Sequence, residues 1–516
     1  MLSKVLSSAT YGVSAYVVEV ETHLERAIPA FSIVGLPDSA VRESRGRIAA
    51  AIRNSGFEFP ARKLTVNLAP ADIRKEGSSF DLPMAVGILA ASAQVSVPSL
   101  REFVMIGELA LDGSLRPVHG VLPIALEVRR RGIGGLLVPS ENGREASIVR
   151  EVGVYPMSSL REVVSFLNAG EARRNPLRID AADLLTAAQD SPSDFADVKG
   201  QETVKRALEV AAAGGHNIIM IGPPGSGKTM LAKRVPTILP PMGLEEALET
   251  TKIHSVAGLL LPGEALVARR PFRSPHHTIS DAALVGGGIL PRPGEISLSH
   301  NGVLFLDELP EFARSVLEVL RQPLEEGHVM INRLKGSLDF PANFMLVCAM
   351  NPCPCGYYTD PAKECTCLPG EIQKYLSRIS GPLLDRIDLH IEVPALKYRD
   401  LASREAGEAS TGIRARVTRA REIQNERFKA IQGLYANAGM QAGEIRRFCR
   451  LDAAGEELLK TAITKIGLSA RAYDRILKVG RTIADLAGSE YIRPAHIGEA
   501  IQYRSLDRNM FDAVRR

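Results

Sequence analysis

The chain is poor in cysteine, with six among 516 residues. So few cysteines exclude a disulfide-built scaffold and favour a reducing compartment. The sequence also lacks a run of about 18 apolar residues, the length that a membrane-spanning helix needs. Its N-terminus has no continuous apolar segment of the kind found in signal peptides. We therefore expect a cytoplasmic protein without a membrane partner.

Neither sign of charge dominates. The chain has 63 lysines and arginines against 59 acidic residues, and its net charge is +4. Such a balance does not by itself indicate a nucleic-acid-binding protein, although cations can still gather locally. The hydrophobic content of 45% is sufficient for globular cores throughout. A chain of this length is expected to form about three domains.

The strongest motif is the sequence GPPGSGKT, which has the spacing of a P-loop. Residues 217–221 before it predict a buried strand, and residues 230–239 after it predict a helix. Glycines let such a loop point backbone N–H groups at phosphate oxygens. Lys228 is then expected to reach the β- and γ-phosphates, and the Thr229 hydroxyl to bind Mg²⁺. The predicted cofactors are ATP and Mg²⁺, bound by Gly222, Pro223, Pro224, Gly225, Ser226, Gly227, Lys228 and Thr229.

Two further apolar stretches end in polar residues. Residues 303–306 lead into Asp307 and Glu308, as in a Walker B strand. Asp307 is expected to hold Mg²⁺, and Glu308 to orient and polarise the attacking water. Residues 344–350 lead into Asn351, which resembles the sensor-1 residue of AAA+ proteins. Together with the P-loop, these motifs predict an enzyme that hydrolyses ATP.

Strands and helices alternate in residues 1–168, which predicts an α/β or α+β domain. Residues 76–81, 107–108, 115–118 and 138–139 of this domain resemble the Lon-protease domain and its ribosomal-protein-like fold. Ser79 falls near the nucleophile position of that family, but residues 120–124 contain no lysine where the family places its base. A serine without a base is a poor nucleophile, so we expect an inactive relative with a role in assembly or interaction. Ser79 is then a turn or helix N-cap residue.

Residues 194–201 lead into a predicted helix before the P-loop strand, an entry that resembles that of AAA+ ATPases. With this resemblance we expect a linker at residues 169–193, an AAA+ ATPase domain with a parallel sheet at 194–397, and a helical lid domain at 398–516. The predicted fold is therefore multi-domain α/β. Helical patterns in the lid cover residues 413–428, 442–448, 453–466, 470–486 and 494–503.

An insert and a hairpin add cations to the ATPase domain. Arg270 and Arg273 lie in the insert between the two nucleotide motifs, and Lys335 lies at the turn of a hairpin predicted within residues 329–340. Such elements resemble those of magnesium chelatases and MCM helicases, in which both face the pore of a ring. We expect the three cations to bind DNA phosphates.

Two arginines complete the expected catalytic set. Residues 381–388 resemble the segment that carries the arginine finger of that clade, which implies that Arg386 reaches the γ-phosphate of a neighbouring subunit. Arg378 is the alternative. Arg471 resembles the sensor-2 arginine. The predicted catalytic residues are Glu308, Asn351, Arg386 and Arg471.

Four of the cysteines form two C-x-C pairs, Cys353 with Cys355 and Cys365 with Cys367. Four thiolates can close a tetrahedral Zn²⁺ site. The spacing is not the common C-x₂-C, so four ordinary cytosolic thiols remain the alternative.

Residues 270–278, 349–356 and 469–477 resemble the YifB/ComM family, magnesium chelatase-like AAA+ proteins with an N-terminal Lon-like domain. The resemblance covers nearly the whole chain in the same domain order. It implies a homo-hexameric ATPase and helicase that acts on single-stranded or branched DNA. Family members are described as driving branch migration during homologous recombination in natural transformation. Three alternatives remain: a chelatase-type ATPase that remodels a protein partner, an ATP-dependent protease, and a scaffold without motor activity.

Overall fold

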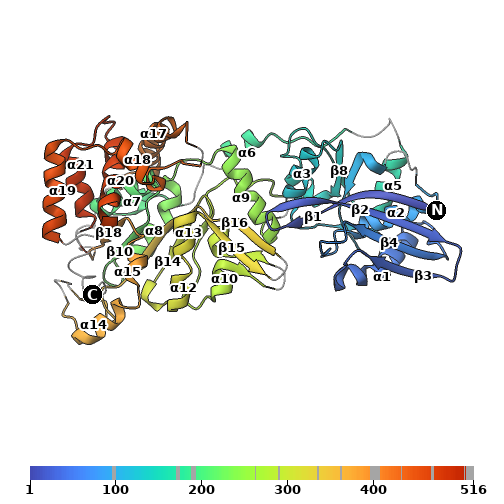
Figure 1. Cartoon of the computed structure of the whole chain (residues 1–516), viewed down its shortest axis with the longest axis horizontal. Helices are drawn as coiled ribbons and strands as arrows, with labels where there is room; N and C mark the ends of the chain where they lie inside the picture. The colour runs from blue at the N-terminus through green and yellow to red at the C-terminus, as the bar shows by residue number, and fades with distance from the viewer. Residues whose placement is uncertain are drawn as a thin grey trace.

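Three units follow one another along the long axis of the molecule (Figure 1). The structure is a computed structural model, which describes residues 1–95, 100–169, 175–187, 193–261, 263–288, 291–333, 336–358, 360, 363–395, 407–431, 433–466, 470–504 and 506. A mixed α/β unit (blue to teal) is followed by a second α/β unit (green through yellow to orange) and a helical unit (dark orange to red). The predicted fold class is confirmed, whereas the domain boundaries stay a prediction.

The first unit is built on a seven-stranded sheet of order β3-β4-β2-β1-β5-β8-β9. Its strands β1 and β2 form a long antiparallel hairpin, and β5, β8 and β9 extend the sheet in parallel from β1. The strands are β1 (Leu2–Tyr11), β2 (Ser14–Glu25), β3 (Ala30–Val34), β4 (Lys63–Ala69), β5 (Phe103–Met105), β8 (Gly135–Pro139) and β9 (Gly153–Met157), with the small pair β6 (Glu108–Leu109) and β7 (Leu115–Arg116) beside them. The helices are α1 (Ser39–Asn54), α2 (Asp81–Ala91), α3 (Val121–Arg130), α4 (Gly143–Ala146) and α5 (Leu160–Asn168).

Local sequence explains most of these elements. Asp38 caps α1, because its carboxylate accepts the backbone N–H of Val41 at 2.8 Å. Strand β1 is missing from the sequence prediction because its buried face includes serines. Ser3 and Ser7 are buried and donate to the carbonyl oxygens of Gly87 and Met105, at 2.7 and 3.0 Å. Each buried hydroxyl is thus satisfied by the backbone, a pairing that apolar periodicity does not reveal.

The second unit contains a five-stranded parallel sheet of order β11-β14-β17-β10-β18. Its central strands are apolar and fully buried, as in parallel sheets covered on both faces. The strands are β11 (Phe272–Arg273), β14 (Val303–Leu306), β17 (Met345–Met350), β10 (Ile218–Ile221) and β18 (Leu389–Glu392). The helices are α7 (Glu202–Gly214), α8 (Lys228–Ile238), α9 (Leu244–Ala257), α10 (Asp281–Val285), α11 (Glu295–Leu298), α12 (Arg314–Glu318), α13 (Arg321–Glu326), α14 (Pro369–Leu376) and α15 (Gly381–Leu384).

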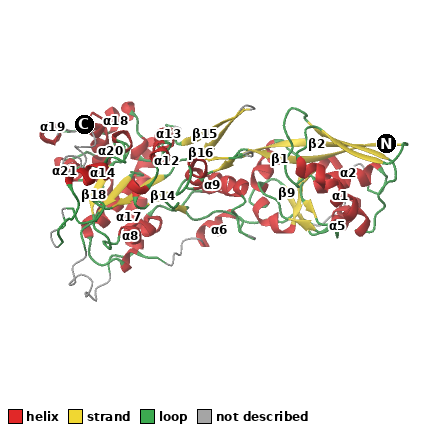
Figure 2. Cartoon of the chain, turned by 90° about the horizontal axis from the view of Figure 1, so that it is seen from below, coloured by secondary structure: helices red, strands yellow, loops and turns green. Residues whose placement is uncertain are grey.

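The predicted hairpin is present. Strands β15 (His328–Arg333) and β16 (Gly336–Pro341) pair in antiparallel fashion and extend from the second unit (Figure 2). Lys335, which the sequence places at the turn, lies outside the described residues. Two shorter strands, β12 (Gly286–Gly287) and β13 (Arg292–Pro293), pair within the insert.

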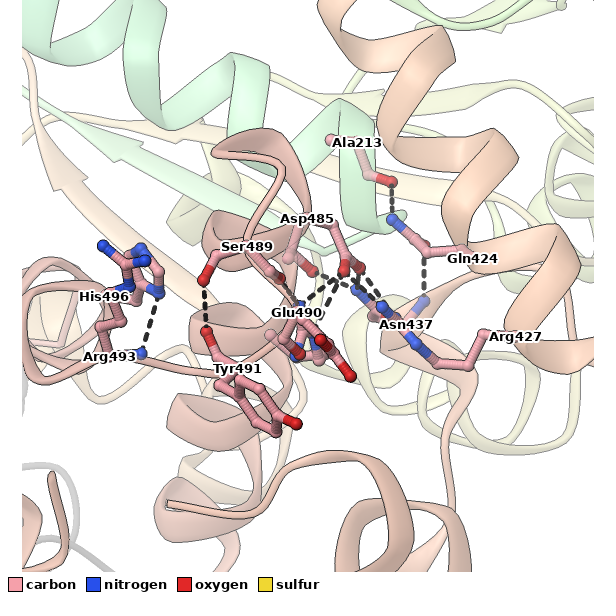
Figure 3. Close-up of polar contacts among 12 residues, drawn as sticks. Ala213, Gln424, Arg427, Asn437, Asp485, Ser489, Glu490, Tyr491, Arg493 and His496 are labelled. Carbon is pink, nitrogen blue, oxygen red and sulfur yellow. Dashed lines mark hydrogen bonds and ion pairs between the residues drawn. The ribbon is translucent and has the colours of Figure 1, made fainter. Parts of the chain in front are cut away.

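The third unit is helical, and its predicted helices are confirmed. They are α17 (Ser410–Phe428), α18 (Ala442–Phe448), α19 (Ala453–Ile466), α20 (Ala470–Leu486) and α21 (Pro494–Gln502). Gln424 fastens this unit to α7, because its amide donates to the carbonyl oxygen of Ala213 at 3.0 Å and accepts from the backbone of Asn437 at 2.9 Å (Figure 3). Nearby, the buried Asp485 accepts from Arg427 at 2.8 Å. Among the described residues, no helix is long and apolar enough to cross a membrane.

Helix α6 (Ala181–Ala187) lies in the predicted linker, but the first two units meet mainly through α3 and α9. Glu145 lies at this contact, where it accepts from the backbone of Leu122 at 2.8 Å and from the hydroxyl of Ser255. Burial raises the pKa of this carboxyl, while the hydrogen bonds favour its charged form. A few residues away, a Cβ on Gly258 would come within 2.7 Å of the His119 ring.

Gly258→Ala should therefore loosen the contact between the first two units. Gly258 has φ +72°, so alanine adds backbone strain of about 1–2 kcal/mol and also meets His119. Gly263→Ala is the matched control, since Gly263 has φ +81° but open space around its Cβ position. We expect a larger drop in melting temperature and faster proteolysis of the linker for Gly258→Ala. Equal behaviour of the two variants would contradict a close fit at His119.

Candidate ATP-hydrolysis site

Parallel pairing brings the predicted nucleotide residues to one edge of the sheet. Ile221, the last residue of β10, pairs with Met350 of β17, and Leu306 of β14 pairs with Cys348. The P-loop, Asp307 and Asn351 follow these strands directly. Ligand sites of open parallel sheets lie at this carboxyl edge.

The P-loop conformation requires glycine at three positions. Gly225 and Gly227 have φ values of +77° and +87°, in the left-handed region. A Cβ on Gly222 would lie 2.1 Å from the carbonyl oxygen of Val393. Outside the loop, the amide of Gln201 donates to the carbonyl oxygen of Ser226 at 2.8 Å and supports the curve. The loop thus has the form that exposes its N–H groups to a phosphate.

Lys228 lies within the loop. Its Nζ donates to the carbonyl oxygens of Gly222 and Pro223 at 2.7 and 2.9 Å and lies 3.3 Å from Oδ1 of Asn351. Burial lowers the pKa of Lys228, whereas the charge of Asp307 opposes this shift. The structure therefore brings Lys228, Asp307 and Asn351 together, as their motifs predict.

The two predicted magnesium ligands are in direct contact. Oγ1 of Thr229 donates to Oδ2 of Asp307 at 2.6 Å. A hydroxyl and a carboxylate are hard oxygen donors, which suit Mg²⁺ bound through one or two protein groups, waters and substrate phosphates. Thr229 and Asp307 thus fit the ion that the motifs imply.

Glu308 has an unusual backbone for a non-glycine residue, with φ +53°. Its N–H donates to Oδ1 of Asp307 at 3.0 Å, and its side chain is 58% exposed. The carboxylate is therefore accessible to water, as a general base must be. Oε2 of Glu308 lies 3.6 Å from Nδ1 of His277.

His277 is a site residue for which the sequence suggests polar or DNA contacts, and not a place beside Glu308. It follows β11, the edge strand that pairs with β14, so the chain passes the end of the Walker B strand. The ring of His276 lies 4.1 Å from that of His277, between centroids. The position of His277 beside Glu308 depends on the pairing of β11 with β14, and the sequence alone does not reveal this pairing.

Arg386 and Arg471 lie close enough for the charge of one to affect the other. Burial, Arg321 and Arg471 lower the pKa of Arg386, while Glu325 raises it. Arg386 is 7% exposed, donates to the carbonyl oxygen of Pro382 at 2.6 Å and pairs with Glu325. It also lines a cavity of about 410 Å³ beside α13.

A buried ion pair sets the position of Arg471. Asp388, two residues after Arg386, pairs with Arg475 of α20, one turn after Arg471. Burial opposes ionisation of Asp388, but Arg475 and His216 hold its pKa well below the usual range. This pair fixes the start of α20 beside β18. The roles of Arg386, Arg378 and Arg471 in hydrolysis stay predictions.

The two insert arginines that we predict to bind DNA have partners within the chain. Arg270 donates to the carbonyl oxygens of Pro240 and Asn301 at 2.6 and 2.8 Å and pairs with Glu246. Arg273 makes a two-pronged ion pair with Glu295, with both distances 2.6 Å. Both guanidinium groups support the insert in this structure, and their contact with DNA stays a prediction.

The Lon-like unit contains an apolar residue where a base is required. Leu122 is fully buried in α3, and its backbone N–H is bound to Glu145. Ser79 precedes α2, but the N-cap position is Phe80 and has no side-chain cap, so Ser79 is a turn residue and not a cap. The neighbouring Ser78 donates to Glu108. Among the described residues, no base contacts Ser79.

The four clustered cysteines come together after β17. Sγ of Cys353 lies 3.3 Å from that of Cys355 and 3.7 Å from that of Cys365, and Cys367 completes the group. The loop follows Asn351 directly, so it lies beside the nucleotide site.

Glu308→Gln should leave ATP binding intact and reduce turnover by at least about 100-fold. The amide keeps the size of the carboxylate but cannot accept the proton of the attacking water. Nucleotide affinity and steady-state hydrolysis are measured together. The control is Glu245→Gln, at an exposed position of α9, with unchanged turnover. Near-normal turnover of Glu308→Gln would remove this residue from the role of base.

Ser79→Ala should leave the rate of ATP hydrolysis unchanged and alter the free energy of unfolding by no more than about 0.5 kcal/mol. The wild type should not degrade casein in the presence of ATP. The reason is the buried Leu122 in place of a base. Release of labelled peptides is the measurement. Degradation by the wild type that disappears in Ser79→Ala would contradict the assignment of an inactive domain.

Known proteins resemble this chain over nearly its full length. It is 47% identical over 508 residues to the competence protein ComM of Haemophilus influenzae, and 44% identical over 512 residues to the protein YifB of Salmonella typhimurium, with 98% of each chain covered in both comparisons. An alignment of 255 positions with Lon protease 2 of Bacillus subtilis has 27% identity and covers 42% of this chain and 44% of that protein.

The family comparisons agree with the motif order. Residues 194–401 match the family described as magnesium chelatase, subunit ChlI, residues 20–142 match subunit ChlI of Mg-chelatase, and residues 407–504 match the C-terminal part of that subunit. The chain belongs to the YifB/ComM family of magnesium chelatase-like AAA+ ATPases with an N-terminal Lon-like domain.

Proposed function

We propose that this protein is a ring-forming, ATP-dependent DNA motor, a helicase that promotes branch migration when incoming DNA recombines during natural transformation. One observation carries the proposal: groups suited to hydrolysing ATP meet at one sheet edge in a chain that matches a competence protein over 98% of its length. Work on incoming DNA requires a cytoplasmic location.

In a ring, a neighbouring subunit can add an arginine to the ATP site of this chain. In a homo-hexamer, Arg386 would approach the γ-phosphate held by the neighbouring subunit, where an arginine finger stabilises charge in the transition state. Glu325 now pairs with Arg386, so this function requires the guanidinium to exchange a carboxylate for a phosphate. The sensor-2 resemblance implies that Arg471 would also reach the nucleotide, and its charge acts on Arg386 in this structure.

The DNA contact is expected on the β15–β16 hairpin. The hairpin extends from the ATPase unit (Figure 2), and the sequence places Lys335 between its two strands. Arg270 and Arg273 have carboxylate partners, so their replacement would disturb the insert itself. Lys335 is therefore the cation that tests the proposal most directly.

A chelatase-type ATPase that remodels a protein partner is the second candidate, because the family match to magnesium chelatase covers the same ATPase unit. The two functions differ in what stimulates hydrolysis. ATP turnover should rise with single-stranded or four-way-junction DNA and fall to background in Glu308→Gln. The motor should also convert a labelled four-way junction into its duplex products. Turnover that is indifferent to every DNA form would contradict the DNA motor and favour the chelatase-type function.

Lys335→Ala should weaken DNA-stimulated hydrolysis and branch migration. Loss of a phosphate contact lowers affinity for all sequences alike and reduces the slope of log affinity against log salt by about one. A salt titration of DNA binding is the measurement, with DNA-independent hydrolysis as a check on the nucleotide site. The control is Lys460→Ala on α19, where the side chain is 76% exposed. An unchanged slope and rate in Lys335→Ala would exclude this lysine from the DNA contact.

A further inference from the structure

The four-cysteine cluster lies between β17 and α14, next to the nucleotide site. The sulfur atoms of Cys353, Cys355, Cys365 and Cys367 all lie within 4.8 Å of one another. Cys348 and Cys449, the other two cysteines, are buried elsewhere, in β17 and after α18. The fold thus brings the two C-x-C pairs, which are separate in the sequence, into one cluster.

The spacing of the sulfurs is that of metal ligands. Sulfur–sulfur distances are 3.3 Å between Cys353 and Cys355, 3.7 Å between Cys353 and Cys365, and 3.6 Å between Cys355 and Cys365. A tetrahedral Zn²⁺ with Zn–S bonds of about 2.3 Å separates its sulfurs by about 3.8 Å. A disulfide joins sulfurs at about 2.0 Å. The cluster therefore has the size of a tetrahedral thiolate site.

Backbone N–H groups of the loop donate hydrogen bonds to two of the four sulfur atoms. Sγ of Cys353 accepts the N–H groups of Gly356 and Tyr358 at 3.2 and 3.3 Å, and Sγ of Cys367 accepts that of Cys355 at 3.3 Å. Such N–H donors stabilise thiolates and orient ligating side chains. Four thiolates at this spacing would repel one another strongly, so all four can be ionised only around a cation.

We propose that Cys353, Cys355, Cys365 and Cys367 bind one Zn²⁺ as a closed structural site that supports the ATP pocket. Four thiolates fill the tetrahedral coordination of Zn²⁺, which leaves no open position for a reacting water. Sulfur ligands also select Zn²⁺ over the Mg²⁺ of the neighbouring pocket, since Mg²⁺ prefers oxygen.

The position of the loop indicates which part of the chain the metal would stabilise. Cys353 is fully buried and lies two residues after Asn351. A Cβ on Gly356 would come within 2.5 Å of the Pro224 ring, so the backbone of the cysteine loop packs directly on the P-loop. The metal thus fixes the chain that joins the sensor residue to the phosphate-binding loop. This consequence rests on the proposed ATPase function, whereas the metal content does not.

Metal analysis of the purified full-length protein tests the site. We expect about one zinc per chain by mass spectrometry, and none in Cys365→Ser combined with Cys367→Ser. Cys449→Ser, which changes a thiol outside the cluster, should retain one zinc. Titration of the wild type with a mercurial reagent should release that zinc as the cluster thiols react, a result that does not depend on a variant's folding. A metal-free wild type, iron in place of zinc, or zinc retained by the double variant would overturn the proposal.

A second variant tests the link to ATP. Gly356→Ala keeps all four cysteines but places a methyl group against Pro224, so zinc content should stay at one while ATP affinity falls about tenfold. Gly433→Ala is the control for backbone strain, because φ is +79° there, compared with +88° at Gly356, and its Cβ position is open. Unchanged ATP affinity in Gly356→Ala would overturn the link to the P-loop. Metal content decides the zinc site separately, and DNA-stimulated hydrolysis decides the proposed function.

Discussion

The parallel pairing of β10, β14 and β17 is the constraint on which the site depends. Because the three strands run in one direction, the groups that follow them must emerge at the same edge. This is why Thr229 meets Asp307 at 2.6 Å although 78 positions separate them in the sequence. A reversal of any one strand would send its polar residue to the opposite edge and leave the site without a ligand.

Elements outside the sheet tie the nucleotide site to the other two units. Gln424 and the Asp388–Arg475 pair hold the helical unit against α7 and β18, and the same ion pair sets Arg471 beside Arg386. On the other side, α9 packs against α3 of the first unit. Arg270 then joins α9 to the insert through Glu246. Ion pairs and hydrogen bonds thus connect both outer units to groups around the ATPase sheet.

The sequence predicts the helices and the nucleotide motifs well because both are local. The cap Asp38 and the P-loop glycines act on their own turns, and the order of motifs along the chain implies the parallel sheet. Three features depend on distant partners and escape such reasoning. The buried serines of strand β1 donate hydrogen bonds to α2 and β5. His277 approaches Glu308 only because β11 pairs with β14, and Arg270 forms an ion pair with Glu246. Each requires the fold to be known first.

The segment of the Lon-like unit in which we expect a base lies at the contact with the ATPase unit. Residues 120–124 contain no lysine, and Leu122 within this segment is fully buried in α3. Its backbone N–H binds Glu145, and Glu145 also binds Ser255 of α9. A lysine at this position would have to bury its ammonium group among apolar neighbours, at a cost of several kcal/mol. Packing of α3 against the ATPase unit and a catalytic lysine on the same helix are therefore difficult to combine. The buried Leu122 is thus consistent with the attachment of this unit to the ATPase unit.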